Sequence, residues 1–214
     1  MNLYDDWADS LFNRDESKGD WRWEIDSEPV ILDDVNSADF FIRLMGELPA
    51  LAERFSLWQI TLGIEYLFNN SMSDFMYTIR DGEISTSKRV EAILSIKALY
   101  LMFSLHCEPK LGHLSEEGGI LNGFCYMLWD TTPLSYGEES KDKKEIYRAI
   151  VYVLQFSLER ENVACIESAL HGLGHLTPYS ELAVKAIQGY IDRDRFQRGE
   201  LLSYANDALT HSIQ

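Results

Sequence analysis

The sequence has few basic residues for its length. Its 214 residues include 19 Lys and Arg against 35 Asp and Glu, which gives a formal net charge of -16. This charge would repel phosphate groups, so we expect no direct binding to nucleic acid and no docking on anionic membranes. A basic protein is the class of partner that the charge favours.

Cysteine is also scarce, and the three cysteines follow no known pattern. Cys107, Cys125 and Cys165 are odd in number, which excludes a complete disulfide framework, and the absence of a CxxC pair excludes zinc-ribbon and thioredoxin-like sites. We expect buried, reduced thiols in a cytoplasmic protein. A thiol catalyst at Cys107, beside His106, or at Cys125 is the less favoured alternative, because burial in an apolar helix makes a thiol unreactive.

Long hydrophobic runs and catalytic motifs are missing as well. The most apolar stretch, residues 90–107, contains Glu91 and Lys97, and therefore predicts a buried core helix rather than a membrane span. The first residues, MNLYDDWADS, lack the basic and apolar regions of a secretory signal. No GxxxxGK[ST], GxGxxG, GxSxG or DFG motif occurs. We therefore assign no catalytic residue and no cofactor, and we expect a protein that is not an enzyme.

The clearest pattern in the sequence is the helical periodicity of its apolar residues. Apolar residues recur at helical spacing from about residue 37 onward, and no strand pattern follows residue 40. We expect Ser37 to cap a helix that Pro49 interrupts, Ser56 to cap the next helix, and Ser87 to cap a long helix that Pro109 ends. Further helices are expected over residues 3–13, 71–79, 120–130, 139–161, 163–176, 180–193 and 198–212. The predicted fold is all-α, as an irregular α-solenoid or a helical bundle of antiparallel helix pairs.

An acidic and aromatic segment precedes this helical region, so we divide the chain into residues 1–36 and one all-α domain over residues 37–214. Residues 1–40 hold twelve acidic and three basic residues, together with three of the five tryptophans. Trp21, Trp23 and Ile25 alternate with charged residues, which predicts a short strand or an extended arm laid on a surface. Carboxylates among tryptophans can mimic a polyanion and bind basic groups. The candidate partner-binding residues here are Asp5, Asp6, Trp7, Asp20, Trp21, Trp23, Asp33 and Asp34. The alternative is that the tryptophans only pack on the helical body.

Residues 160–194 carry a more specific pattern of two helices joined by a short turn that contains Pro. The first helix has the run Ala169-Leu170-x-Gly-Leu-Gly and the second has Ala183-Val184-x-x-Ile187. This segment resembles HEAT-like helical repeats, a likeness that implies a curved stack of helices with a concave protein-binding surface. A strict period is absent, and Glu167 stands where the family usually has a basic residue. The stretches CYMLWD and ESALHGLGH also resemble uncharacterised bacterial all-α proteins of similar size.

Glu167, His171 and His175 are spaced four residues apart within the same segment. Residues at this spacing share one face of a helix, and two imidazoles with a carboxylate can bind a divalent transition metal. The HExxH pattern of metalloproteases is absent, however. We expect no bound metal, and we interpret these three residues as polar positions that contact a partner. The alternative is a metal-dependent enzyme, to which His106 or His113 adds a further ligand.

Trp129 and Asp130 close the expected helix over residues 120–130. They could line a pocket, or they could serve as a packing anchor and a cap, and the structural role is the favoured interpretation because helix ends require such partners.

The function that these observations favour is a protein-binding module. Compact size, strong acidity and the lack of a catalytic motif suggest an immunity-type or antitoxin-type inhibitor of a basic effector, such as a nuclease toxin. Such an inhibitor would act by occlusion and charge complementarity. An adaptor or scaffold without inhibitory action is the alternative within the same class.

Overall fold

The regular structure of the chain is helical throughout the part that can be described. The computed structural model describes residues 2–24, 28–136, 140–193 and 198–213, and these residues contain no strand. The α-helices are α1 (Leu3–Phe12), α2 (Asp34–Arg54), α3 (Leu57–Phe68), α4 (Phe75–Asp81), α5 (Thr86–Ser95), α6 (Lys97–His106), α7 (Ile120–Thr131), α8 (Lys143–Ser157), α9 (Val163–Leu176), α10 (Glu181–Asp192) and α11 (Gly199–Leu209). The short 3₁₀ helices are η1 (Glu16–Lys18), η2 (Trp21–Trp23), η4 (Gly112–Leu114) and η5 (Pro133–Tyr136). The all-α prediction is confirmed.

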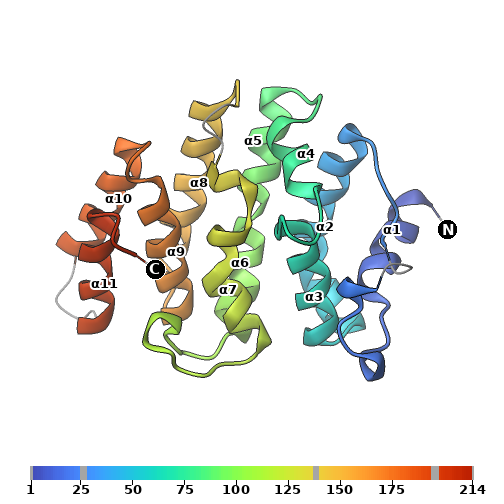
Figure 1. The fold of residues 1–214 in the computed structure, drawn as a ribbon, viewed down its shortest axis with the longest axis horizontal. Coiled ribbons are helices and arrows are strands. Elements are labelled where there is room, and N and C mark those ends of the chain that lie inside the picture. Colours follow the sequence, from blue (N-terminus) through green and yellow to red (C-terminus); the bar gives the residue numbers. More distant parts are fainter. Residues whose placement is uncertain (1, 25–27, 137–139, 194–197, 214) are drawn as a thin grey trace.

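The helices advance along the long axis of the molecule, from α1 at one end to α10 and α11 at the other (Figure 1). Helices α1, α3, α7, α9 and α11 each contact the next in that order, and α2, α5, α8 and α10 do the same in a second row. Helix α6 contacts α7 and α9 of the first row as well as α2 and α8 of the second. The buried apolar side chains of these rows pack together to form the core.

Several helix boundaries follow from local chemistry that the sequence reveals. Ser56 forms a capping box with Gln59 at the start of α3, as its position predicts. Helix α9 begins and ends where the apolar pattern places it, at Val163 and Leu176. None of the described helices combines the length and the apolar character needed to cross a bilayer.

The first long helix differs from its prediction at both Ser37 and Pro49. Helix α2 begins four residues before the expected start, because the side chain of Asp33 caps it by accepting from the backbone N–H of Asn36 at 2.8 Å. Ser37 is buried inside the first turn. Helix α2 also continues through Pro49, since the buried side chains on both sides of the proline pack on the same core and offset the lost hydrogen bond.

The expected long helix from Ser87 to Pro109 is in fact two helices, and Ser85 caps the first of them. The break lies at Ile96, whose N–H bonds to the carbonyl of Ile93 in a tightened turn. The hydroxyl of Ser95 donates to the carbonyl of Ala92 at 2.6 Å and so competes with the regular helical ladder.

The strand predicted around residues 21–25 is wrong for the part described, while the alternative of an arm laid on the helical body stays a prediction. Trp21–Trp23 forms the 3₁₀ helix η2, which the carboxylate of Asp20 caps. Ile25 lies outside the described residues. A charged residue between two aromatics fits a strand by its period, but a capping Asp directly before the segment favours a turn.

The described part of the N-terminal segment packs on the rest of the chain. The Trp7 ring lies 5.8 Å from the ring of Phe40 and 5.9 Å from that of Phe75, measured between centroids. A Cβ built on Gly63 of α3 would lie 2.6 Å from the ring of Phe12. Only glycine at this position lets α1 approach α3 so closely.

Candidate functional site

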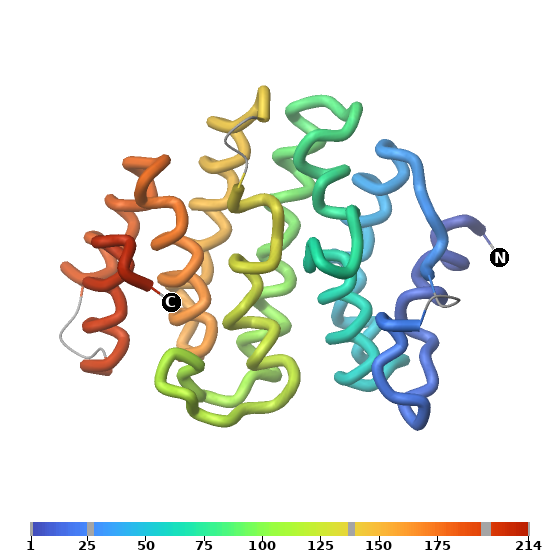
Figure 2. The backbone as a smooth tube through the Cα atoms, in the orientation of Figure 1, coloured from blue at the N-terminus to red at the C-terminus, as the bar shows by residue number. Residues whose placement is uncertain are grey.

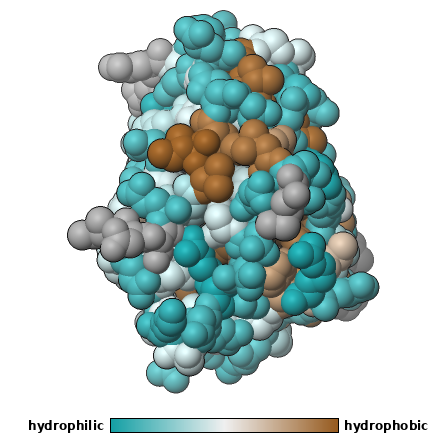
Figure 3. Space-filling model, turned by 90° about the vertical axis from the view of Figure 1, so that its right-hand side faces the viewer, coloured by the Kyte–Doolittle hydropathy of each residue, from teal (hydrophilic) through white to brown (hydrophobic). Residues whose placement is uncertain are grey.

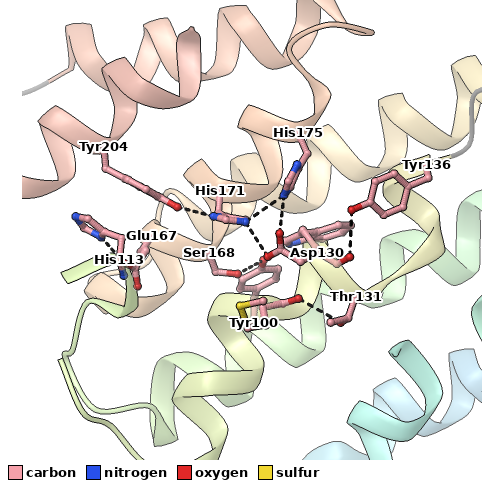
Figure 4. Close-up of polar contacts among 12 residues, drawn as sticks. Tyr100, His113, Asp130, Thr131, Tyr136, Glu167, Ser168, His171, His175 and Tyr204 are labelled. Atoms are coloured by element: carbon pink, nitrogen blue, oxygen red, sulfur yellow. Dashed lines mark hydrogen bonds and ion pairs between the residues drawn. The ribbon is translucent and has the colours of Figure 1, made fainter. Parts of the chain in front are cut away.

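A cluster of one carboxylate and two imidazoles lies where the end of α7 meets α9 (Figure 4). Asp130 is in the last turn of α7, and His171 and His175 occupy successive turns of α9. One Asp130 oxygen lies 2.7 Å from Nε2 of His171, and the other lies 3.0 Å from Nε2 of His175. The two Nε2 atoms are 3.1 Å apart. One ligand atom from each of the three side chains lies within 4.8 Å of the other two.

His171 is the buried member of this cluster, with 1% of its surface exposed. Its Nδ1 is hydrogen-bonded to the hydroxyl of Tyr204 on α11, and the Tyr126 ring of α7 lies 5.1 Å away in an edge-on arrangement. Side chains of α7 and α11 thus fix the orientation of the imidazole. The other two members reach solvent, since the side chains of His175 and Asp130 are 20% and 26% exposed.

Two pKa values in and beside the cluster depart from their usual values. Burial acts to raise the pKa of Asp130, but its contacts with His171 and His175 outweigh burial and hold that pKa well below its usual range. Asp130 is therefore ionised at neutral pH. Burial raises the pKa of Tyr204, with a further rise from its hydrogen bond to Tyr126, so this phenol stays protonated. The site presents an anionic carboxylate to two imidazoles.

Glu167 does not join the two histidines, although it shares their spacing. Its buried carboxylate accepts hydrogen bonds from the backbone N–H groups of Gly112 and His113 at 2.8 and 2.9 Å, and it contacts Nδ1 of His113 at 2.5 Å. It thereby anchors the loop between α6 and α7, which reaches toward α9 along one edge of the molecule (Figure 2). Of the two other histidines considered as ligands, His113 is paired with Glu167 and His106 is exposed at the end of α6.

Sequence reasoning missed Asp130 as the carboxylate of the cluster. Asp130 was considered as a pocket residue or a cap at the end of a helix, and its neighbour Trp129 is wholly buried. The indole Nε1 of Trp129 donates to the hydroxyl of Tyr100 at 2.7 Å, and that hydroxyl is also hydrogen-bonded to Ser168. Trp129 is thus a packing anchor, while Asp130 takes part in the cluster.

The cysteines lie in the core. Cys107, Cys125 and Cys165 are free and buried, as predicted. Burial raises the pKa of the Cys125 thiol well above its usual value, which keeps it protonated and unreactive.

The three candidate tryptophans of the N-terminal segment have different environments. Trp7 and Trp21 are buried, and the guanidinium of Arg14 lies 4.0 Å above the Trp21 ring. Trp23 is 69% exposed. Only Trp23 of the three can offer most of its surface to a partner.

The acidic candidates of this segment divide into capping and open residues. Asp20 and Asp33 cap η2 and α2, and Asp34 accepts from the backbone N–H of Glu83 at 2.5 Å. Asp5 is exposed and Asp6 is partly exposed, both in the first turn of α1. Some of the carboxylates of this segment are therefore already hydrogen-bonded to the backbone of the protein.

The repeat-like segment forms two consecutive helices, α9 and α10, that contact each other. Its resemblance to HEAT-like repeats stays a prediction. Comparisons of the chain with protein-family models, with curated proteins and with solved structures each gave no match.

Proposed function

We propose that this protein is a binding module for a basic protein, and that it acts as an immunity-type or antitoxin-type inhibitor of an effector such as a nuclease toxin. The observation that carries the proposal is the distribution of charge in the N-terminal segment. Its arginines are turned toward the protein, whereas many of its carboxylates face solvent.

The two arginines of this segment are engaged by neighbouring side chains. The guanidinium of Arg14 lies over the Trp21 ring. Arg22 is ion-paired with Asp20 at 2.6 Å and with Glu65 at 2.7 Å, and its side chain is only 8% exposed. Neither arginine can therefore fully offset the surrounding acidity at the surface.

Carboxylates remain at the surface of the same segment. The exposed acidic residues with described surroundings include Asp5, Asp15, Glu16, Glu28 and Asp33. Such a surface attracts a basic partner over several ångströms and speeds association, mostly at low ionic strength. Carboxylates placed this way could take the positions of substrate phosphates on a nuclease.

Apolar side chains at this end supply contact area to complement the charge. Trp23, Val30 and Ile31 are exposed, and Ile31 has 86% of its surface open to solvent. Figure 3, which views this end of the molecule, shows an apolar area bordered by hydrophilic side chains. An apolar centre with a charged rim is the usual composition of a protein-binding surface.

The arrangement of helices supports the same class of function. The two rows of contacting helices are compatible with an irregular α-solenoid of antiparallel pairs with HEAT-like packing. In a stack of this kind, each helix pair adds surface that a partner protein can contact.

A capture experiment with matched variants tests the proposal. The bait is the full chain, presented to an extract of its own source as wild type, as the triple variant Asp5→Asn, Glu16→Gln, Glu28→Gln, and as the control Glu159→Gln, Glu161→Gln, Asp207→Asn. Both variants remove three exposed carboxylates and change the net charge from -16 to -13. We expect wild type and control to retain one basic protein that the N-terminal variant loses.

Activity then separates an inhibitor from an adaptor. The purified partner should lose its activity when the protein binds, and the N-terminal variant should associate more slowly and with a weaker dependence on salt. Equal retention by both triple variants would contradict the proposed surface. A bound partner that keeps its activity would favour the adaptor alternative.

A further inference from the structure

We propose that Asp130, His171 and His175 form a binding site for one divalent late first-row transition-metal ion, with Zn²⁺ as the representative ion. This proposal is independent of the protein-binding function above, because none of the three residues belongs to the N-terminal surface. It also goes against the sequence-based expectation of no bound metal, and it differs from the alternative set of Glu167, His171 and His175, since Asp130 replaces Glu167.

The spacing of the three ligand atoms is close to that of a metal site. In tetrahedral coordination with bonds of about 2.0–2.1 Å, neighbouring ligand atoms lie about 3.3 Å apart. Here the two Nε2 atoms are 3.1 Å apart, and each lies within 3.0 Å of a different oxygen of Asp130. One ligand atom from each of the three side chains lies within 4.8 Å of the other two. Small rotations of the side chains would therefore bring one carboxylate oxygen and the two nitrogens to the spacing of a bound ion.

Hydrogen bonding alone does not satisfy these three side chains. If both Nε2 atoms carry a proton, two N–H donors face each other at 3.1 Å. If only His175 carries it, the lone pair of His171 Nε2 faces Asp130 Oδ2 at 2.7 Å, and if only His171 carries it, the lone pair of His175 Nε2 faces Asp130 Oδ1 at 3.0 Å. The Oδ2 atom is buried and accepts no hydrogen bond of ordinary geometry from the described residues. A metal cation that binds the unprotonated Nε2 atoms and the carboxylate replaces these repulsions by attractions.

The surroundings of His171 match those of a metal-bound imidazole. A histidine that ligates through Nε2 carries its proton on Nδ1 and donates it to a neighbouring group, which fixes the tautomer and the ring. Nδ1 of His171 is hydrogen-bonded to the hydroxyl of Tyr204. The Tyr204 ring in turn stacks on His113 with 4.3 Å between centroids, so the partner of Nδ1 is itself held in place.

The ligand set indicates the class of ion, and the exposure of the ligands indicates whether the site is open to solvent. Two imidazole nitrogens and one carboxylate suit Zn²⁺, Co²⁺ or Ni²⁺, whereas Mg²⁺ and Ca²⁺ require mostly oxygen ligands. The partly exposed side chains of His175 and Asp130 leave one side of the cluster open to solvent. A bound ion would link α7 to α9 and keep a coordination position for water or for a group of another molecule.

A Co²⁺ titration of the full chain tests the site, because bound Co²⁺ has visible absorption bands that report its ligand geometry. The variants are His175→Ala and Asp130→Asn, both at partly exposed positions, and the matched control is His106→Ala at an exposed position on α6. His171→Ala is avoided because it would open a cavity in the core. Circular dichroism spectra verify that each variant is folded.

We expect wild type and His106→Ala to bind one equivalent of Co²⁺ that Zn²⁺ displaces. Each ligand variant should weaken the affinity by at least about tenfold, since loss of a supporting residue alone commonly has that effect. Zn²⁺ should raise the melting temperature of wild type and of His106→Ala more than that of His175→Ala. Absence of Co²⁺ bands in wild type, or equal binding by wild type and His175→Ala, would overturn the proposal. The cluster would then be a proton-sharing network.

Discussion

Two glycines of α9 should respond differently to replacement by alanine, because only one of them packs against α7. Gly172 and Gly174 are both helical positions of α9. Replacing a helical glycine by alanine stabilises a helix by about 1 kcal/mol. The two sites differ in what the added methyl group would meet.

At Gly172 the new Cβ would lie 2.7 Å from the Cγ and Cδ1 atoms of Trp129 and 3.1 Å from a methyl group of Leu154. Trp129 cannot move aside easily, because it is fully buried and its Nε1 is hydrogen-bonded to Tyr100. Overpacking of this kind costs about 1–3 kcal/mol. We therefore expect Gly172→Ala to lower the free energy of unfolding by up to about 2 kcal/mol once the helical gain is included.

At Gly174 the main obstacle is the Cδ1 atom of Ile213, 2.5 Å from the new Cβ. Ile213 is a partly exposed residue that follows α11, so rotation of its side chain can relieve this contact and that of its Cγ1 atom at 3.1 Å. The Cα atom of Ala208, at 3.3 Å, requires only a slight adjustment. Gly174→Ala should therefore be neutral or stabilising by up to about 1 kcal/mol.

Urea unfolding followed by circular dichroism measures the difference between the two variants, which should be about 1–3 kcal/mol. In a chain of this length, each kcal/mol corresponds to about 2–4 °C in melting temperature. If Gly172→Ala is as stable as Gly174→Ala, the indole of Trp129 is free to move and the reasoning on the α7–α9 contact is wrong.

Three further predictions concern the second row of helices and the N-terminal segment. The hydrogen bond from Arg89 holds the pKa of Asp142 below its usual 3.8, so this pair stabilises the fold at neutral pH and loses its effect as the pH falls below that value. Asp142→Asn should lower the free energy of unfolding by about 1–3 kcal/mol at pH 7. The difference from wild type should shrink in acid. A difference in unfolding free energy that stays constant with pH would contradict the pairing of Arg89 with Asp142. Trp7→Ala should cost about 3–5 kcal/mol because the indole is buried among aromatic rings. Trp23→Ala should change stability by less than about 0.5 kcal/mol but weaken partner binding, and unfolding curves together with the capture assay separate the two effects.

Sequence periodicity predicted the helices well where the signal was local. The capping box at Ser56 and the limits of α9 depend on neighbouring residues, and both agree with the structure. The break at Ile96 and the continuity through Pro49 were not predicted. The continuity through Pro49 depends on how the buried side chains on both sides of it pack on the core, which the local pattern does not encode. The break at Ile96 accompanies the hydrogen bond from Ser95 to the carbonyl of Ala92, which a serine in a helix allows but does not require.

The carboxylate of the site shows why spacing alone was misleading. Four residues of an α-helix turn through about 400°, so each step from Glu167 to His171 to His175 rotates the side chain by about 40° around the axis. Glu167 and His175 therefore point about 80° apart. Glu167 faces the loop that carries His113, whereas His175 faces the end of α7, where Asp130 lies. Asp130 precedes His175 by 45 residues, and only the packing of two helices brings them together.

The acidity of the chain determines how the metal site must be tested. A protein with a net charge of -16 concentrates divalent cations around its exposed carboxylates whether or not a specific site exists. The metal content of the wild type alone therefore does not distinguish an ion in the proposed site from ions held around surface carboxylates. The variants His175→Ala and His106→Ala leave the formal charge unchanged, since both histidines count as neutral, so non-specific binding is the same in both. A difference between them reports coordination by one imidazole of the cluster, and equal binding would trace the metal to the acidic surface.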